Sequence, residues 1–331
     1  MKVLILTSTY LPNIGGIEHH IASFSSHWQQ LGHECEVAVV EGPIAYQQEL
    51  IEGVKVYRIP SLLTKPLQLF KPLGTYIPNI KSFDMVLVHD PHYLGLTFHF
   101  LLNRKVYRQK LVSMTHGGFF HTAKWKTLKK IVFNTLFRYL VSVYDQVVAV
   151  SQSDLIAFKG KSGVKRITLI ENGVEELGCP QDKCFTPKIK FIYFGRFSAN
   201  KQVEILVSVA RALINITPLN MQFTFIGAGD DNATKAVDAL VNDYPEHVSY
   251  FPHLPAQNLK DEIEQANVFW TASSYEGFGM SVVESMMSGL VPIVNDIPVL
   301  RKLVNHRQDG LVIDYSRNYN KVAQDIINEF S

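Results

Sequence analysis

Short apolar runs alternate with longer amphipathic segments along this chain of 331 residues, and the pattern occurs twice. In the first half the apolar runs are rich in β-branched residues and are bounded by Gly, Pro, Asp or His, as buried strands are. Alternating strands and helices form parallel sheets with right-handed crossovers. The strands predicted in the first half are residues 2–7, 36–40, 85–88, 111–115 and 146–150, and the clearest helix is 17–31.

A stretch rich in Gly and Pro separates the two sets of segments. We therefore predict an α/β protein of two Rossmann-like domains, residues 1–172 and 191–331, joined by a linker over 173–190. Ligands of such sheets bind beyond the carboxyl ends of the strands, so a deep cleft between two facing domains is the expected site. The strands predicted in the second half are residues 189–194, 222–226, 248–251, 268–271, 291–294 and 311–313.

The formal net charge of +2 hides an asymmetry between the two halves. Residues 1–175 carry 19 Lys and Arg against 12 Asp and Glu, whereas residues 176–331 carry 13 against 18. No acidic residue lies between Asp90 and Asp145, a segment that contains nine basic residues. A block of one sign predicts an anionic partner for the first half.

Residues 104–138 hold this basic block, and within it lysines interleave with apolar residues over 124–133. The spacing over 124–133 is that of a helix. A helix with interleaved lysines and apolar residues can lie on an anionic bilayer, which predicts a membrane-facing first domain. The alternative is an ordinary surface helix with its apolar face in the core. A nucleic-acid partner is not expected, because the block lacks a recognisable binding motif and the other half is acidic.

The three cysteines, Cys35, Cys179 and Cys184, are an odd number in a long chain, which argues for a reducing compartment. No apolar run approaches the ~18 residues of a membrane span, and the N-terminus does not resemble a secretory signal. We therefore expect a cytoplasmic protein, with a peripheral position on the inner face of the cell membrane compatible with the basic block. No zinc-ligand spacing occurs, and we expect no metal.

A glycine pair, Gly15 and Gly16, follows the first predicted strand and opens the first predicted helix. Paired glycines let the backbone approach a ligand closely, and a helix N-terminus offers free N–H groups to an anion. A tight strand-to-helix turn is the alternative. The loop is not the G-x-G-x-x-G pattern of dinucleotide sites.

Two cations, Arg196 and Lys201, lie just past the first strand of the second half. An arginine fork and a lysine point charge together can neutralise a diphosphate. The alternative is a pair of solvated surface cations.

Two glutamates, Glu276 and Glu284, bracket a glycine loop and the start of a helix after the strand 268–271. The helix N-terminus suits a phosphate, and the flanking carboxylates can accept hydrogen bonds from sugar hydroxyls. The alternative is that Glu276 is a carboxylate at a helix start and Glu284 a surface residue, neither with a ligand. This pattern is the most specific in the chain.

His116 follows a strand of the first half and is a candidate proton or hydroxyl partner. The chain has twelve histidines, and His19, His20, His89 and His253 are among those that compete with it. A lone histidine is more often structural.

Together these motifs resemble those of glycosyltransferase family 4, retaining transferases with the GT-B fold, and the resemblance covers almost the whole chain. The matching positions are Gly15 with Gly16, residues 172–174, Gly195 and Arg196 with Lys201, and the E-x₇-E pair Glu276 and Glu284.

The resemblance implies a role for each residue. Glu276 would contact the donor sugar near the reacting centre, and Glu284 would bind the nucleotide ribose. His116 would hydrogen-bond the donor sugar, so that its removal costs transition-state stabilisation more than binding. The other donor contacts would come from Gly15, Gly16, Arg196, Lys201, Gly277, Phe278, Gly279 and Met280.

The implied reaction is a retaining transfer from a nucleotide diphosphate sugar, without metal or cofactor. No protein nucleophile is evident, and a front-face displacement is implied. Residues 115–122 are similar to a segment of bacterial exopolysaccharide mannosyltransferases, which implies GDP-mannose as donor and a polyprenyl-diphosphate-linked oligosaccharide, or another glycan, as acceptor. A UDP-sugar-dependent transferase, a nucleotide-sugar epimerase or hydrolase, and a non-enzymatic membrane scaffold are the alternatives.

Family members usually continue for some tens of residues past a strand such as 311–313, and their last helices pack back onto the first domain. Here one short helix is expected after that strand. The resemblance therefore predicts either an abbreviated crossover or a sequence cut short, and in both cases altered domain closure.

Overall fold

A computed structural model shows two compact units, Met1–Asn172 and Gly173–Ser331. Most of the expected linker and most of the basic block lie outside the described residues. The described residues are 1–13, 15–63, 68–89, 94–116, 135, 140–159, 166–174, 188–216 and 220–330.

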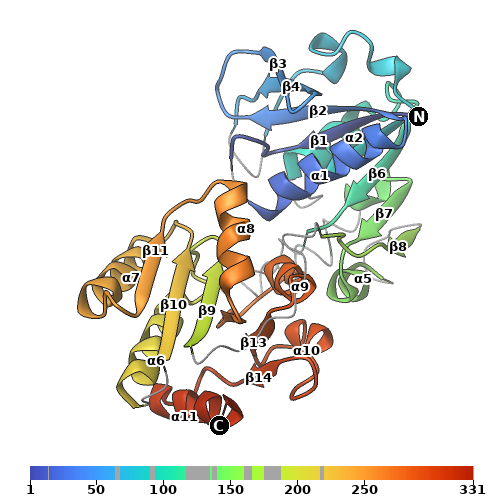
Figure 1. Ribbon diagram of the computed structural model, residues 1–331. Helices are drawn as coiled ribbons and strands as arrows, with labels where there is room; N and C mark the ends of the chain where they lie inside the picture. The colour runs from blue at the N-terminus through green and yellow to red at the C-terminus, as the bar shows by residue number, and fades with distance from the viewer. Residues whose placement is uncertain are drawn as a thin grey trace. The chain divides into compact units, whose positions relative to one another are not determined.

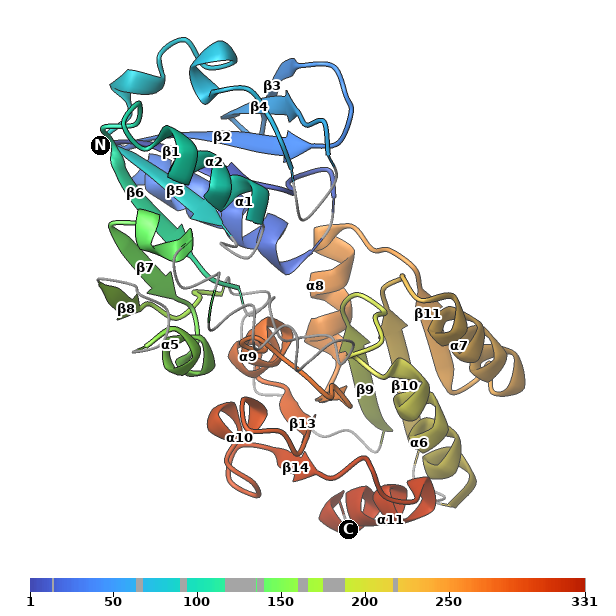
Figure 2. The same ribbon diagram turned by 180° about the vertical axis from the view of Figure 1, so that it is seen from behind.

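An eight-stranded sheet in the order β3-β4-β2-β1-β5-β6-β7-β8 forms the first unit (Figure 1). Helix α1 covers one face of this sheet and helix α2 covers the other, as the two opposite views show (Figure 2). In chain order the elements are β1 Lys2–Thr7, α1 Gly16–Gln30, β2 Glu34–Glu41, β3 Gln47–Ile51, β4 Val54–Pro60, β5 Met85–His89, α2 Leu94–Asn103, β6 Lys110–Met114, β7 Gln146–Ala149, α5 Gln152–Phe158 and β8 Ile167–Leu169.

Residues 3–6 of strand β1 are all apolar because both faces of the strand are buried. Val3 and Ile5 belong to the core that contains Ile21 of α1, whereas Leu4 and Leu6 belong to the core that contains Leu96 of α2. Alternate residues of a strand point to opposite faces, so a sheet covered on both faces needs apolar residues at every position.

The prediction of a purely parallel first sheet is wrong at one edge. Strand β3 pairs antiparallel with β4, and residues Glu52 and Gly53 connect them, both with positive φ. Two such residues form the tight turn whose twist suits a hairpin. Strand β3 escaped sequence analysis because it is polar and almost fully exposed, so it lacks an apolar period. Strand β4 was missed as well, although most of its residues are buried. Strand β8, at the other edge, is a three-residue addition that was also missed.

The second unit is a six-stranded sheet in the order β11-β10-β9-β12-β13-β14, and all its pairings are parallel. The six strands predicted in this half are confirmed, with shifts of at most two residues at the ends. The elements are β9 Lys188–Phe194, α6 Val203–Ile216, β10 Asn220–Ile226, α7 Asp231–Asp243, β11 Val248–Phe251, α8 Ala256–Gln265, β12 Val268–Thr271, α9 Met280–Met287, β13 Val291–Asn295, α10 Leu300–Leu303, β14 Leu311–Ile313 and α11 Tyr319–Phe330.

Two hydrophobic cores flank this second sheet. Phe191 and Tyr193 of β9 belong to the core built with helices α6, α7 and α11. Ile192 and Phe194 belong to the other, built with α8, α9 and α10. The expected Rossmann-like architecture is therefore present in both units, and it fixes which loops meet at the carboxyl edge of each sheet.

Each sheet has a switch point beside its first strand, where the chain crosses from one side of that strand to the other. In the first sheet the chain runs from β1 to β2 on one side and then returns to β5 on the other side of β1. In the second it runs from β9 through β10 to β11 and returns to β12 on the other side of β9. Loops separate at such a point, so it is the expected ligand position in each unit. Within the described residues, no helix is both long enough and apolar enough to cross a bilayer.

Candidate functional site

The switch point of the second sheet holds the best-formed candidate site. Strands β9 and β12 are neighbours, so the loop with the two predicted cations and the loop with the first predicted glutamate leave the sheet side by side. Asn200 ties the loops together: its side-chain Nδ2 donates to the Tyr275 carbonyl over 3.0 Å. The backbone N–H of Ser274 in turn donates to the Asn200 carbonyl over 2.8 Å.

Lys201 and Glu276 form an ion pair across these two loops. Lys201 Nζ donates to Glu276 Oε1 over 2.6 Å, and the two side chains are 20% and 10% exposed. The structure therefore brings together two residues that lie 75 positions apart in the sequence. A half-buried pair of this kind is screened less by solvent than a surface pair, so each partner holds the other in place.

Arg196 is exposed on the same loop that carries Lys201. The Tyr193 hydroxyl, at the end of β9, donates to the Arg196 carbonyl over 3.2 Å. Its neighbour Gly195 has φ +147°, a conformation that favours glycine. The backbone around Arg196 is thus fixed from within the sheet.

The Gly227-Ala228-Gly229 segment packs against the backbone of this loop. A Cβ on Gly227 would lie 1.9 Å from the Gly195 carbonyl oxygen, and one on Gly229 would lie 2.1 Å from the Phe197 carbonyl oxygen. The Phe197 N–H donates to the Ala228 carbonyl over 2.9 Å. These glycines therefore allow two loops to pack backbone to backbone beyond the ends of β9 and β10.

Helix α9 starts between the two predicted glutamates. Glu276 precedes the helix, and Glu284 lies half-buried in its second turn. The N-cap is Gly279, with φ +97°, and no side chain caps the helix. Its first N–H groups are therefore directed out of the helix end without a side-chain acceptor, which suits an anion. Gly277, Phe278 and Met280 are half-buried around this helix start.

Asn295, at the end of β13, is a supporting residue that sequence reasoning missed. Its Nδ2 donates to the carbonyls of Ala272 and Ser273 at 3.4 and 3.1 Å, and its Oδ1 accepts from the N–H of Asp296 and of Tyr315 at 2.9 and 3.3 Å. It therefore holds the start of the loop that carries Glu276. Its position at a strand end was the only available signal.

The glycine pair of the first unit lies at the start of α1, as predicted. Gly15 is the N-cap in an extended conformation and makes no side-chain cap hydrogen bond, and nothing lies within 4 Å of a Cβ placed on Gly16. The open space over Gly16 allows a ligand to approach the backbone. Close by, Thr9 Oγ1 donates to the buried Glu18 carboxylate over 2.5 Å, which anchors the first turn of α1.

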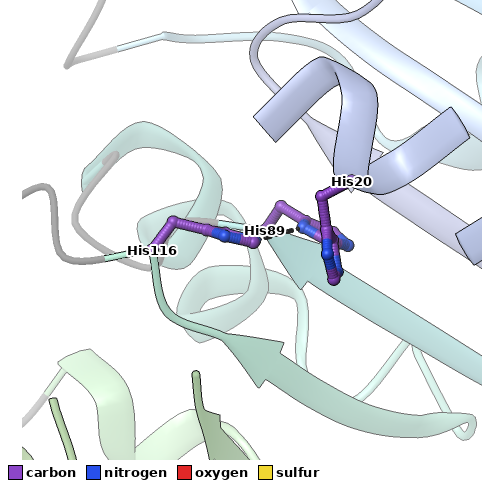
Figure 3. A group of neighbouring side chains, drawn as sticks. All are labelled: His20, His89 and His116. Atoms are coloured by element: carbon purple, nitrogen blue, oxygen red, sulfur yellow. Dashed lines mark hydrogen bonds between the residues drawn. The ribbon is translucent and has the colours of Figure 1, made fainter. Parts of the chain in front are cut away.

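His116 does not stand alone at the switch point of the first sheet. Its Nε2 and the Nδ1 of His89 form a hydrogen bond of 2.8 Å, and the His20 ring lies with its centroid 5.0 Å from that of His116 (Figure 3). His20 comes from α1, His89 ends β5 and His116 follows β6. Sequence analysis noted all three histidines but not that they meet, because their contact depends on the order of strands β1, β5 and β6.

Burial keeps two members of this histidine trio, His20 and His89, neutral. Burial lowers the pKa of His89 well below its usual value, and the neighbouring His116 and His20 lower it further. Burial also lowers the pKa of His20 to about 4, with a smaller effect from His19. At neutral pH the rings of His20 and His89 therefore each offer one unprotonated nitrogen atom.

Two family descriptions match consecutive parts of the chain. Residues 14–176 match Glycosyltransferase Family 4, and residues 181–329 match Glycosyl transferases group 1. Several of the matching relatives are named GDP-mannose:cellobiosyl-diphosphopolyprenol alpha-mannosyltransferase. The relative from Xanthomonas campestris is 29% identical over 331 residues, which cover 96% of this chain and 84% of that protein. The relative from Komagataeibacter xylinus is 27% identical over 326 residues, which cover 95% and 80%.

Solved structures with the same fold cover the whole chain. Sucrose-phosphate synthase from Thermosynechococcus elongatus aligns with a TM-score of 0.71 and 17% identity, over 100% of this chain and 90% of that one. Anabaena Alr3699/HepE, in complex with UDP and glucose, aligns with a TM-score of 0.70 and 15% identity, again over 100% and 90%. At such low identity these likenesses establish the GT-B fold.

Proposed function

Because the chain belongs to glycosyltransferase family 4, whose members are retaining enzymes of the GT-B fold, we propose that it moves mannose from GDP-mannose to a polyprenyl-diphosphate-linked oligosaccharide. The names of the two relatives at 27% and 29% identity support this donor and this class of acceptor. The local observation that supports a sugar diphosphate is the Lys201–Glu276 pair beside the uncapped start of α9.

The donor diphosphate would lie between the cations and the helix start. Arg196 and Lys201 supply positive charge, and the free N–H groups of α9 supply hydrogen-bond donors. The charge that develops on the leaving diphosphate is stabilised most by groups that are already held in place. Lys201 is held by Glu276, and the Arg196 backbone is held by the packed glycine loops.

Glu276 would accept a hydrogen bond from a donor-sugar hydroxyl, and Glu284 from the nucleotide ribose. Binding of the diphosphate draws Lys201 toward the phosphates and leaves Glu276 to accept hydrogen bonds from the sugar. His116 would hydrogen-bond the sugar from the first unit. These roles come from the family resemblance.

In the proposed reaction the bond between the anomeric carbon and the β-phosphate oxygen breaks. The acceptor hydroxyl oxygen forms its bond on the same face of the sugar, so the configuration is retained. The acceptor proton moves to the leaving phosphate oxygen, and the products are a glycoside and GDP. The residues of the chain position the groups and stabilise charge; none forms a covalent bond in this scheme.

A panel of donors tests the proposal. The thermal midpoint of the chain is measured with GDP-mannose, UDP-glucose and ADP-glucose, since a ligand that binds only the folded state raises it. Transfer is then measured with GDP-mannose and a diphosphopolyprenol-linked cellobiose. If UDP-glucose alone raises the thermal midpoint, the proposed donor GDP-mannose is wrong and the alternative, a UDP-sugar, is supported. Release of free sugar or epimer without acceptor would instead favour a hydrolase or epimerase.

The first unit is proposed to face the acceptor and an anionic membrane. Of the basic block, residues 104–116 and 135 are described, and within them Arg104 pairs with Asp145 at 3.0 Å. We expect binding to vesicles that contain phosphatidylglycerol and loss of that binding as salt rises. Equal binding to neutral vesicles, or none to either, would contradict a charge-driven contact.

A further inference from the structure

We propose that His20, His89 and His116 form a binding site for one divalent transition-metal ion, of the class that includes Zn²⁺ and Co²⁺. One imidazole nitrogen from each residue lies within 4.8 Å of the others. Nothing in the relatives or the fold assigns this site, and it departs from the sequence-based expectation that the chain holds no metal.

The distances between the ligand atoms are close to those of a metal site. Zn²⁺ binds imidazole nitrogens at about 2.0–2.1 Å in tetrahedral geometry, which places two such nitrogens roughly 3.4 Å apart. Here one pair of nitrogens, His89 Nδ1 and His116 Nε2, lies 2.8 Å apart, and the most distant pair is within 4.8 Å. Small rotations of the rings therefore bring all three into range.

Buried imidazole nitrogen atoms without a hydrogen-bond partner are further evidence for a metal site. The buried Nε2 atoms of His20 and His89 have no hydrogen-bond partner in the described part of the chain. His89 is fully buried, so water does not compensate for the missing partner. An unsatisfied buried polar atom costs about 1–3 kcal/mol, and a metal that binds Nε2 of His20 removes that cost for His20. His89 gains a partner for its Nε2 only if the metal binds that atom instead of Nδ1.

The ligand set selects the kind of metal. All three ligands are imidazoles, which suit Zn²⁺, Co²⁺, Ni²⁺ and Cu²⁺, whereas Mg²⁺ and Ca²⁺ prefer oxygen. The nearest buried carboxylate along α1, Glu18, already accepts a hydrogen bond from Thr9. Three protein ligands leave a fourth position open.

Rigid elements hold the three ligands. His89 is the last residue of β5 and pairs in register with Met114 of β6, two residues before His116. His20 projects from the first turns of α1 toward the other two rings (Figure 3). Because the ligands come from a helix and the ends of two paired strands, little ordering is needed when the ion binds.

A bound metal would take His116 away from the donor sugar. This consequence rests on the proposed function: an ion that uses the His116 lone pair is expected to inhibit transfer, and a chelator to restore it. Metal binding itself does not rest on that function and is measured without any donor.

Titration of the chelator-treated chain with Co²⁺ tests the site, because Co²⁺ takes the same ligands as Zn²⁺ and absorbs visible light when four- or five-coordinate. We expect one equivalent to bind, with displacement by one equivalent of Zn²⁺. His20→Gln should weaken binding at least about tenfold. The matched control is His19→Gln, which changes the exposed neighbouring residue on α1 and should bind as the wild type does.

Three outcomes decide the proposal. Loss of Co²⁺ binding in His20→Gln with retention in His19→Gln supports it. Equal binding by both variants, or no stoichiometric binding by the wild type, overturns it and leaves the trio as a hydrogen-bonded support for His116. If His20→Gln does not fold, as judged by circular dichroism, His116→Gln replaces it, since that residue is only half-buried. A chain that binds Co²⁺ but neither binds nor turns over any donor would remove the proposed function and leave the metal site standing.

Discussion

Lys201 Nζ lies 2.6 Å from Glu276 Oε1, so a cation expected to bind the donor diphosphate and a carboxylate expected to bind the donor sugar contact each other directly. The pair joins the loops after β9 and β12 at the switch point of the second sheet. Each side chain is mostly buried, and removal of either one leaves the other charge without its partner. The pair is therefore expected to fix the geometry of the two loops at the site.

Glu276→Gln is expected to lower kcat/KM for transfer by about 10²-fold or more, because the proposed contact of this carboxylate with the donor sugar is lost while the shape of the side chain is kept. Binding of GDP should change little, since GDP lacks the sugar that Glu276 is proposed to contact. Steady-state transfer and a GDP thermal shift measure the two effects. Glu264→Gln, on the exposed side of α8, is the matched control, and wild-type turnover of Glu276→Gln would remove Glu276 from the site.

A double-mutant cycle on Lys201→Met and Glu276→Gln should give a coupling energy of about 0.5–3 kcal/mol. Each single change leaves one mostly buried charge unpaired, whereas the double variant leaves none. Urea unfolding of the four proteins measures the coupling. Additive effects on stability would show that the contact contributes nothing to the folded state.

Gly227→Ala should destabilise the second unit by more than about 3 kcal/mol and weaken donor binding. The new Cβ would lie 1.9 Å from the Gly195 carbonyl oxygen, at a residue with φ +140°, so the loop that carries Arg196 must move. Gly32→Ala is the control: φ is +79° and nothing lies within 4 Å of its Cβ, so it should cost only about 1 kcal/mol. Urea unfolding measures both costs, and equal costs would rule out backbone packing as the reason for Gly227.

Most of the second unit could be predicted from the sequence because its strands are short, apolar and covered on both faces. Periodicity and bounding residues suffice for such strands. The β3–β4 hairpin could not be predicted in this way, because β3 is polar and exposed at a sheet edge. A turn of Glu52 and Gly53 was the only local signal.

Contacts between segments that are distant in the sequence were the part of the site that was harder to predict. The motif residues Glu276, Lys201 and His116 were found as single positions, but their partners depend on which strands are neighbours. Asn295 and the His20–His89 contact carry no spacing signal at all, since each joins separate elements. Strand order, which the sequence pattern leaves open, decides these contacts.

His99 makes the stability of the first unit sensitive to acid. It is buried in α2, stacks on Phe70 with ring centroids 4.2 Å apart, and its Nε2 lies 2.8 Å from the Tyr107 hydroxyl. Burial lowers its pKa from 6.5 to about 4. As the pH falls below 6.5, the unfolded chain takes up a proton that the folded unit does not, so stability is full above pH 6.5 and is lost down to about pH 4.

The expected loss from His99 alone is on the order of 3 kcal/mol across that range. Urea unfolding followed by hydrogen exchange of first-unit peptides measures it at pH 7, 5.5 and 4. His99→Phe keeps the stacked ring but removes the titrating group, so its stability should fall less steeply than that of the wild type. His20 and His89, whose pKa values are lowered in the same direction, account for the slope that remains in the variant. Parallel curves for the two proteins would show that His99 takes up its proton equally in the folded and unfolded states.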